Sequence, residues 1–197
     1  MERLLKQLEK CGYEAKFFGT ADELKAYATT IMPKGSVAGF GGSMTIEEIG
    51  LKPYLKDKGY NLLIPDETHT REELLPKEHF ADFYFLSANA LTEKGEIINL
   101  DGTGNRIGAS AFGPKNVVYI VGKNKIVKDL AEGIDRVKNV ASPKNAKRLN
   151  KKTPCAVTGK CENCDSPDRI CKAWLITERA LNKKKTYIFI VNEELGY

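Results

Sequence analysis

The chain has 197 residues, of which 42% are hydrophobic and 29% charged, a composition that fits one ordinary folded domain and excludes a disordered chain or a large multidomain assembly. The net charge is +5, from 31 basic and 26 acidic residues, and the basic excess gathers at residues 143–152 and 183–185. Such runs suit either an anionic partner or a solvated basic face. No nucleic-acid-binding signature accompanies them and no aromatic residues interleave with them, so nucleic acid is not an expected partner.

No segment approaches the roughly 20 consecutive apolar residues that a membrane helix needs. The first residues alternate charge with leucine and lack the apolar core of a secretory signal. We therefore expect a cytoplasmic protein with no membrane partner.

Helical and strand patterns alternate along the first 150 residues. Apolar spacing predicts helices at the start of the chain up to Gly12, over 21–32, from about Thr45, where Glu48 completes a capping-box spacing, and over 71–75, 125–140 and 173–181. Continuous apolar runs predict strands over 36–40, 61–64, 82–87, 96–100, 117–121 and 186–191.

Strands that are apolar along their whole length are typical of parallel sheets, which are buried on both faces. We therefore predict an α/β fold, a three-layer, open and mostly parallel sheet, with residues 1–197 as one domain. Residues 143–172 are predicted to form an embedded basic, cysteine-rich loop.

A first glycine-rich loop, GFGGSMT at 39–45, leads from a predicted strand into a predicted helix. Its backbone N–H groups could bind a phosphate or a carboxylate, or the glycines could simply form a tight turn. A dinucleotide fingerprint would need glycine at Met44, and no GK[ST] follows, so neither an NAD nor an ATP motif is present. The candidate ligand-binding residues are Gly41, Gly42, Ser43, Met44 and Thr45.

A second glycine-rich loop, LDGTGNRIG at 100–108, is dense in polar residues. In an open parallel sheet it could face the first loop across a cleft, although Asp-Gly and Asn also build ordinary turns. Asp101 and Glu93 are candidate catalytic acids, bases or nucleophiles, and Arg106 is a candidate anion clamp. The further candidate ligand-binding residues are Asn89, Thr92, Gly102, Thr103, Gly104 and Asn105.

Four of the five cysteines, Cys155, Cys161, Cys164 and Cys171, follow one another as C-x5-C-x2-C-x6-C. In a reducing compartment such crowding favours metal ligation over disulfides, and four thiolates suit zinc or an iron-sulfur cluster. The spacing does not choose between the two. A redox dithiol at Cys161 and Cys164, or buried thiols, would explain the same residues.

Several segments together resemble a known family. These are GGSMT, the long block from SANALTEKG to GKNKIV, PKNAKRL and TPCAVTGKCENCDSPDRIC. The chain resembles the lactate-utilisation (LUD) domain family, in its cysteine-containing single-domain branch. The resemblance implies a fold similar to that of sugar-phosphate isomerases and CoA-transferases (NagB/RpiA-like). It also implies a link to lactate oxidation through iron-sulfur redox partner proteins, which favours a cluster at the cysteines.

Three functional hypotheses follow. The first is a component of lactate or organic-acid utilisation that binds a small anionic metabolite, with a metal or iron-sulfur cluster at the cysteines. The second is an enzyme acting on a sugar phosphate or an acyl-CoA. The third is a metabolite-sensing module with structural zinc. The sequence is compatible with an oligomer but specifies no interface, and it names no substrate.

Overall fold

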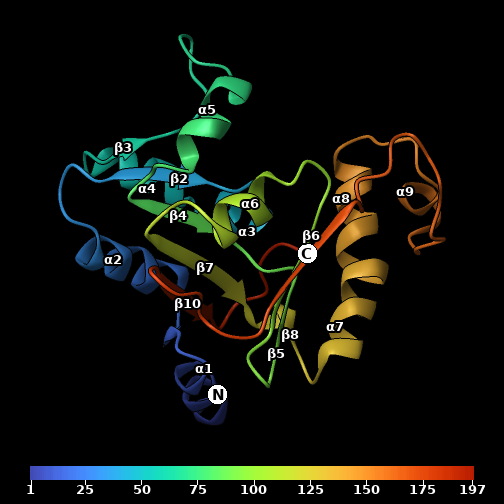
Figure 1. Ribbon diagram of the computed structural model, residues 1–197, viewed down its shortest axis with the longest axis horizontal. Coiled ribbons are helices and arrows are strands. Elements are labelled where there is room, and N and C mark those ends of the chain that lie inside the picture. The colour runs from blue at the N-terminus through green and yellow to red at the C-terminus, as the bar shows by residue number, and fades with distance from the viewer.

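The computed structural model describes residues 1–197, which form two sheets and nine α-helices (Figure 1). All neighbouring strands of the larger sheet are parallel, which confirms the predicted mostly parallel α/β fold. In spatial order its strands are β1 (Glu14–Phe18), β10 (Lys185–Val191), β7 (Asn116–Gly122), β4 (Phe83–Leu86), β2 (Val37–Phe40) and β3 (Asn61–Leu62).

Helices cover both faces of this sheet, because side chains along each strand point alternately to one face and the other. In β10, Phe189 joins one core while Ile188 and Ile190 join the other. The Phe189 side is covered by α2 (Ala21–Ile31), α3 (Met44–Glu48) and α4 (Leu51–Asp57). The opposite side is covered by α1 (Glu2–Lys10) and α6 (Asn105–Ala111). None of the helices has the length and apolarity to cross a membrane.

The smaller sheet lies beside the carboxyl ends of the larger sheet's strands. It contains β8 (Ile126–Val127), β5 (Ala90–Thr92), β6 (Ile97–Asp101) and β9 (Ala173–Thr177), in that order. One face packs against the helix α7 (Leu130–Arg136), where a side chain at Gly133 would collide with Ile98. Glycine therefore allows this helix to approach the sheet closely.

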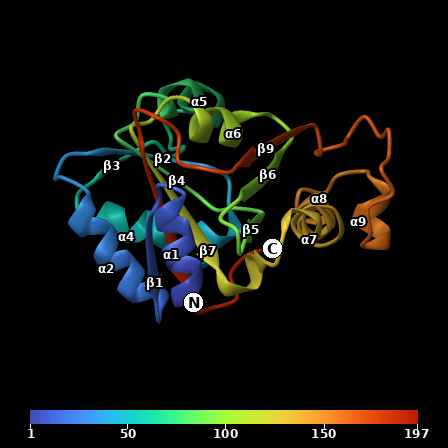
Figure 2. The same ribbon diagram turned by 60° about the horizontal axis from the view of Figure 1, so that its bottom comes forward.

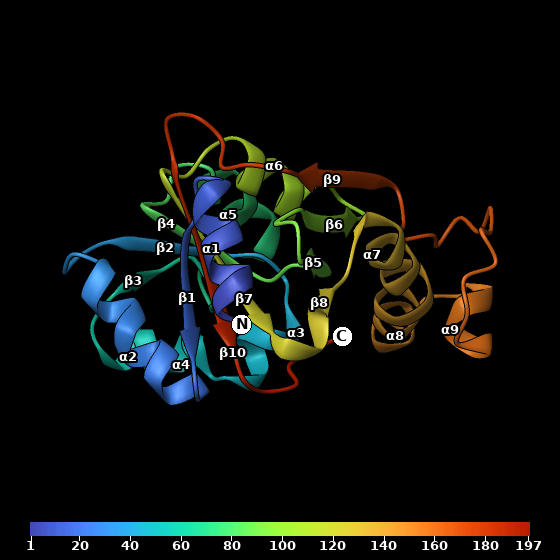
Figure 3. The ribbon, with the colours of Figure 1, turned by 90° about the horizontal axis from the view of Figure 1, so that it is seen from below.

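A long helical segment stands at the edge of the molecule (Figures 1 and 2). It comprises α7, a π-helical turn at Val137–Ala141, and α8 (Ser142–Arg148), and we call residues 130–148 the helical arm. Arg136 ties the arm to the sheets by donating hydrogen bonds to the carbonyl oxygens of Asn89 (2.6 Å) and Asn124 (3.1 Å). The helix α9 (Pro154–Thr158) lies beyond the arm, as the view in Figure 3 shows.

The six predicted strands are all present, but β1, β5, β8 and β9 were not predicted as strands. The helix predicted over 173–181 is wrong: this segment forms β9, whose residues alternate between half-buried and exposed and pair antiparallel with β6. The helix predicted over 125–140 begins only at Leu130, because the Asp129 side chain caps it by accepting the N–H of Glu132.

Two further local predictions need correction. Residues 143–148, predicted as part of a loop, lie in α8, which continues directly from the π-helical turn and has Pro143 in its first turn. Thr45 is not a helix cap. Ser43 caps α3 by accepting the N–H of Ile46, and the buried Thr45 hydroxyl instead donates to the carbonyl oxygen of Leu195. The short helix predicted to start at Arg71 is α5 (Arg71–Glu78).

Two buried tyrosines provide a test of the core. The Tyr84 hydroxyl is buried without a hydrogen-bond partner, whereas the Tyr13 hydroxyl donates to the carbonyl oxygen of Thr177 at 3.1 Å. Tyr84→Phe should therefore leave the free energy of unfolding unchanged or raise it by about 1 kcal/mol, and Tyr13→Phe should lower it by about 1 kcal/mol. Urea denaturation measures both. Equal losses in the two variants would contradict the assignment of Tyr84 as unpartnered.

Candidate functional site

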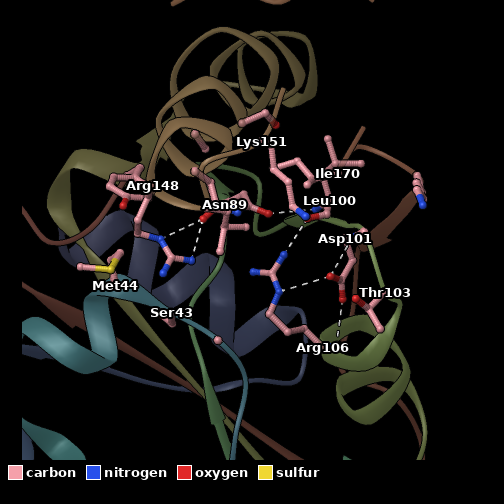
Figure 4. A pocket seen from close by; sticks show the side chains of 18 of the residues that line it. Ser43, Met44, Asn89, Leu100, Asp101, Thr103, Arg106, Arg148, Lys151 and Ile170 are labelled. Atoms are coloured by element: carbon pink, nitrogen blue, oxygen red, sulfur yellow. Dashed lines mark hydrogen bonds and ion pairs between the residues drawn. The ribbon is translucent and has the colours of Figure 1, made fainter. Parts of the chain in front are cut away.

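A cavity of about 440 Å³ lies between the carboxyl edge of the larger sheet, the smaller sheet and the helical arm (Figure 4). We call it the large cavity. Three parallel strands end beside it and supply polar side chains: Ser43 follows β2, Ser87 follows β4, and Lys125 follows β7. Loops after parallel strands gather at one edge of a sheet, where ligands of open α/β folds bind.

The lining of the large cavity is strongly basic, with seven cationic side chains against the carboxylates of Asp101 and Asp168. Only two of the cations are paired with a carboxylate: Arg71 with Glu78, and Arg106 with Asp101. The cavity therefore has a surplus of positive charge that an anionic ligand would neutralise. The seven are Arg71, Arg106, Lys125, Arg148, Lys151, Arg169 and Lys172.

The carboxylate of Asp101 organises the second glycine-rich loop. It accepts the backbone N–H groups of Gly102 (2.9 Å), Arg106 (2.9 Å) and Ile107 (3.3 Å), so it caps the first turn of α6. Figure 4 shows the Arg106 guanidinium between Asp101, 3.6 Å away, and the carbonyl oxygen of Leu100, to which it donates at 2.6 Å. The buried carboxylate thus holds Arg106 at the cavity wall.

Glycine is required at two positions of this loop. A Cβ at Gly102 would lie 2.9 Å from the carbonyl oxygen of Ile170, so only glycine lets the cysteine-bearing segment approach this closely. Gly104 precedes α6 with a φ of 88°, in the left-handed region. The N–H of Lys172 donates to the carbonyl oxygen of Asp101 at 3.1 Å and closes the contact between the two segments.

An ion pair between the half-buried Arg71 and the buried Glu78 supports the first glycine-rich loop. Arg71 donates to Glu78, two helical turns along α5 (2.5 Å), and to the carbonyl oxygen of Phe40 (3.1 Å), the last residue of β2. Burial raises the pKa of Glu78, while the neighbouring Arg71 opposes that shift. The pair fixes the end of β2, from which Gly42 and Ser43 enter the cavity lining.

Lys125 is the most deeply buried cationic side chain of the large cavity, with 3% of its surface exposed. Its Nζ contacts the hydroxyl oxygens of Thr45 (2.8 Å) and Ser87 (3.0 Å). Burial, with the nearby positive charges of Arg136 and Arg106, lowers the pKa of Lys125 to about 7, against a smaller opposing effect of Glu48. A large fraction of this lysine is therefore uncharged near neutral pH.

The structure brings most of the predicted ligand-binding residues together. Both glycine-rich loops contribute to the large cavity, through Gly42, Ser43, Met44, Asp101, Gly102, Thr103, Asn105 and Arg106, and Asn89 joins them. Four other predicted residues are not part of the lining: Gly41, Thr45, Thr92 and Gly104. Glu93 lies apart, in a separate depression formed with α1.

Sequence reasoning missed Lys125 and the cations of the helical arm and of the segment that follows it. The only signal was their position: Lys125 follows a buried strand, and Arg148 and Lys151 lie in the basic run at 143–152. Figure 4 shows these two later residues projecting from α8 and the turn after it.

The four clustered cysteines line a second, smaller cavity of about 60 Å³, which we call the cysteine cavity. None forms a disulfide. Burial raises the pKa of Cys171, and the neighbouring Cys155 and Cys161 act in the same direction. The donor set suits zinc or an iron-sulfur cluster, but no three cysteine, histidine or carboxylate side chains are positioned to hold a metal ion together.

The two cavities share a wall formed by Ser142, Arg169 and Ile170. Arg169 donates to the carbonyl oxygens of Cys164 (2.6 Å) and Cys171 (2.8 Å) and therefore braces the cysteine-bearing segment. The same guanidinium contributes positive charge to the large cavity.

The fold and the cavity define an open, parallel α/β domain with a basic cavity at the carboxyl edge of its sheet. The LUD domain model matches residues 1–191, and the chain belongs to the LUD domain family. A DUF162 family protein from Deinococcus radiodurans has a similar structure, with 14% sequence identity, a TM-score of 0.55, and coverage of 97% of this chain and 95% of that chain.

A more distant structural match is eIF2B beta from Chaetomium thermophilum, at 16% identity and a TM-score of 0.41, over 57% of this chain and 44% of that chain. The tetrameric eIF2B complex of beta and delta subunits from the same organism matches at 16% identity and a TM-score of 0.40. No curated protein sequence matches the chain.

The pKa of Lys125 predicts a pH dependence of stability. Between about pH 7 and about pH 10 the unfolded chain keeps a proton on Lys125 that the folded chain has released, so the stability contributed at this site rises with pH. Relative to Lys125→Met, the wild type should gain up to about 1.4 kcal/mol of unfolding free energy per pH unit in that range.

Urea denaturation of both proteins across the range measures this difference. Lys123→Met, at an exposed lysine two residues away, is the matched control and should show no such slope. A flat difference for Lys125→Met would mean that Lys125 stays charged in the folded protein.

Proposed function

We propose that this LUD-domain protein takes part in lactate or organic-acid utilisation by binding a small anionic metabolite in the large cavity. Family membership supports the metabolic context. The observation that carries the proposal is the charge of the lining, where five of the seven cationic side chains have no carboxylate partner.

The arrangement of the cations suits recognition of a carboxylate or a phosphate. Lys125 lies at the buried end of the large cavity, and Arg148, Lys151 and Lys172 lie on segments closer to the surface. Charge-assisted hydrogen bonds from such groups are stronger than neutral ones, and arginine can bind both oxygens of a carboxylate or phosphate. A ligand with two or more negative charges would use both sets of cations. This observation supports the second candidate, an enzyme that acts on a sugar phosphate or an acyl-CoA.

Ligand binding can be tested by thermal unfolding with lactate, pyruvate, inorganic phosphate, ribose 5-phosphate and coenzyme A. At least one of these anions should raise the melting temperature, because a ligand that binds only the folded state stabilises it. Arg148→Glu should weaken that binding at least about tenfold, since it replaces a cavity cation by an anion.

Lys144→Glu makes the same charge change at an exposed position of α8 that does not line the large cavity, and should leave the affinity nearly unchanged. Equal losses of affinity in the two variants would mean that binding depends on the net charge of the protein and not on a contact with Arg148. No shift with any of the five anions would overturn the proposal.

We further propose that Cys155, Cys161, Cys164 and Cys171 bind zinc or an iron-sulfur cluster. This is supported by the four cysteines lining one small cavity, although in this structure their thiols do not form a preassembled metal site. A cluster would supply one-electron transfer and suit iron-sulfur redox partners of lactate oxidation, whereas zinc would tie the segment together.

Elemental analysis and a visible spectrum of protein purified without oxygen test this site. Stoichiometric iron with broad visible absorbance, or stoichiometric colourless zinc, should be found in the wild type and lost in Cys161→Ser and Cys164→Ser. Cys11→Ser, at a buried cysteine outside the cysteine cavity, should retain the metal. Free thiols with neither metal would eliminate the proposal.

A further inference from the structure

Lys125 combines features that anion binding alone does not require. It is buried at the end of β7, in contact with residues that follow β2 and β4, and it lines the large cavity. No carboxylate lies within ion-pair distance of its Nζ, although burying an unpaired ammonium group is costly. A buried lysine without a counter-ion is stabilised in its uncharged form.

The hydrogen bonds around Nζ fit an uncharged amine. The Thr45 hydroxyl donates its proton to the carbonyl oxygen of Leu195 (3.2 Å), and the Ser87 hydroxyl donates to that of Ala88 (3.3 Å). Both hydroxyl oxygens must therefore accept hydrogens from Lys125, at 2.8 Å and 3.0 Å. A neutral amine has two such hydrogens and one lone pair, so the two donations leave its lone pair free.

Charges on the surrounding elements agree with this assignment. Arg136 on α7 and Arg106 on α6 both disfavour the ammonium form of Lys125. Glu48 on α3 favours the ammonium form, but its effect is smaller than that of burial. With burial, they lower the pKa of Lys125 to about 7. Desolvation beside other cations is a known way of activating a lysine as a nucleophile.

We propose that Lys125 is a nucleophilic residue whose Nζ forms an imine with the carbonyl carbon of an anionic aldehyde or ketone bound in the large cavity. This inference rests on the proposed binding of an anionic metabolite and narrows its chemical class. The remaining cations of the lining would hold the carboxylate of a 2-oxo acid or the phosphate of a phosphorylated sugar.

The reaction balances without an oxidant or reductant. The amine lone pair forms the C–N bond, and a proton moves from nitrogen to the carbonyl oxygen to give a carbinolamine. The carbinolamine then loses its hydroxyl group and the second amine hydrogen as water, which leaves the imine. Ser87, whose hydroxyl lies 3.0 Å from Nζ and which also lines the cavity, is placed to pass the proton.

Reductive trapping tests the proposal on the full chain. The protein is incubated with sodium cyanoborohydride and either pyruvate or dihydroxyacetone phosphate, and adducts are located by intact-mass measurement and peptide mapping. We expect one reduced adduct per chain at Lys125. Trapping with pyruvate alone would identify a carboxylate ligand, and trapping with dihydroxyacetone phosphate alone a phosphate ligand.

Lys125→Met should abolish the adduct, and it should fold because it removes the buried amine. Lys123→Arg, which alters the exposed neighbour, should keep the adduct. Melting curves with the same compounds distinguish imine formation at Lys125 from anion binding in the large cavity. Melting shifts without an adduct at Lys125, or adducts only at exposed lysines, would overturn the imine while leaving anion binding intact. Neither a shift nor an adduct would overturn both.

Discussion

All six strands of the larger sheet run in the same direction, and this constraint decides where polar chemistry can occur in the molecule. Both faces of the sheet are covered by helices, so a charged side chain on either face would be buried in apolar surroundings. In the four central strands, β10, β7, β4 and β2, the only charged residue is Lys185, which stands at a strand end. Because the strands are parallel, Ser43, Ser87 and Lys125 leave three different strands at the same edge. The smaller sheet and the helical arm then enclose that edge.

Asp101, a candidate catalytic residue from the sequence, has a structural role in the second glycine-rich loop. Its carboxylate is engaged by three backbone N–H groups and by Arg106, which keeps it from moving freely toward a ligand. It shapes the loop that faces the cavity. The Nζ of Lys125, by contrast, has only the hydroxyl groups of Thr45 and Ser87 as hydrogen-bond partners. Burial without a paired carboxylate therefore lowers the pKa of Lys125.

Local patterns predicted the sheet well, since long apolar runs such as 117–121 and 186–191 have one stable place in an α/β domain. Residues of both glycine-rich loops line the large cavity, an arrangement that the sequence left open beside ordinary turns. The local patterns failed where pairing decided the structure: residues 173–177 have a helical apolar spacing but complete the smaller sheet beside β6. The burial of Lys125 was not predictable because its contacts Thr45 and Ser87 are 80 and 38 residues away in the sequence.

The shared wall between the two cavities has a mechanical consequence. Arg169 is anchored to the carbonyl oxygens of Cys164 and Cys171, and its guanidinium also lines the large cavity. A rearrangement of the thiol-bearing segment therefore displaces a positive charge in the neighbouring site. Gly102, in close contact with Ile170, transmits the same movement to the loop that Asp101 organises. The shape and charge of the large cavity therefore depend on the conformation of a segment whose cysteines lie outside it.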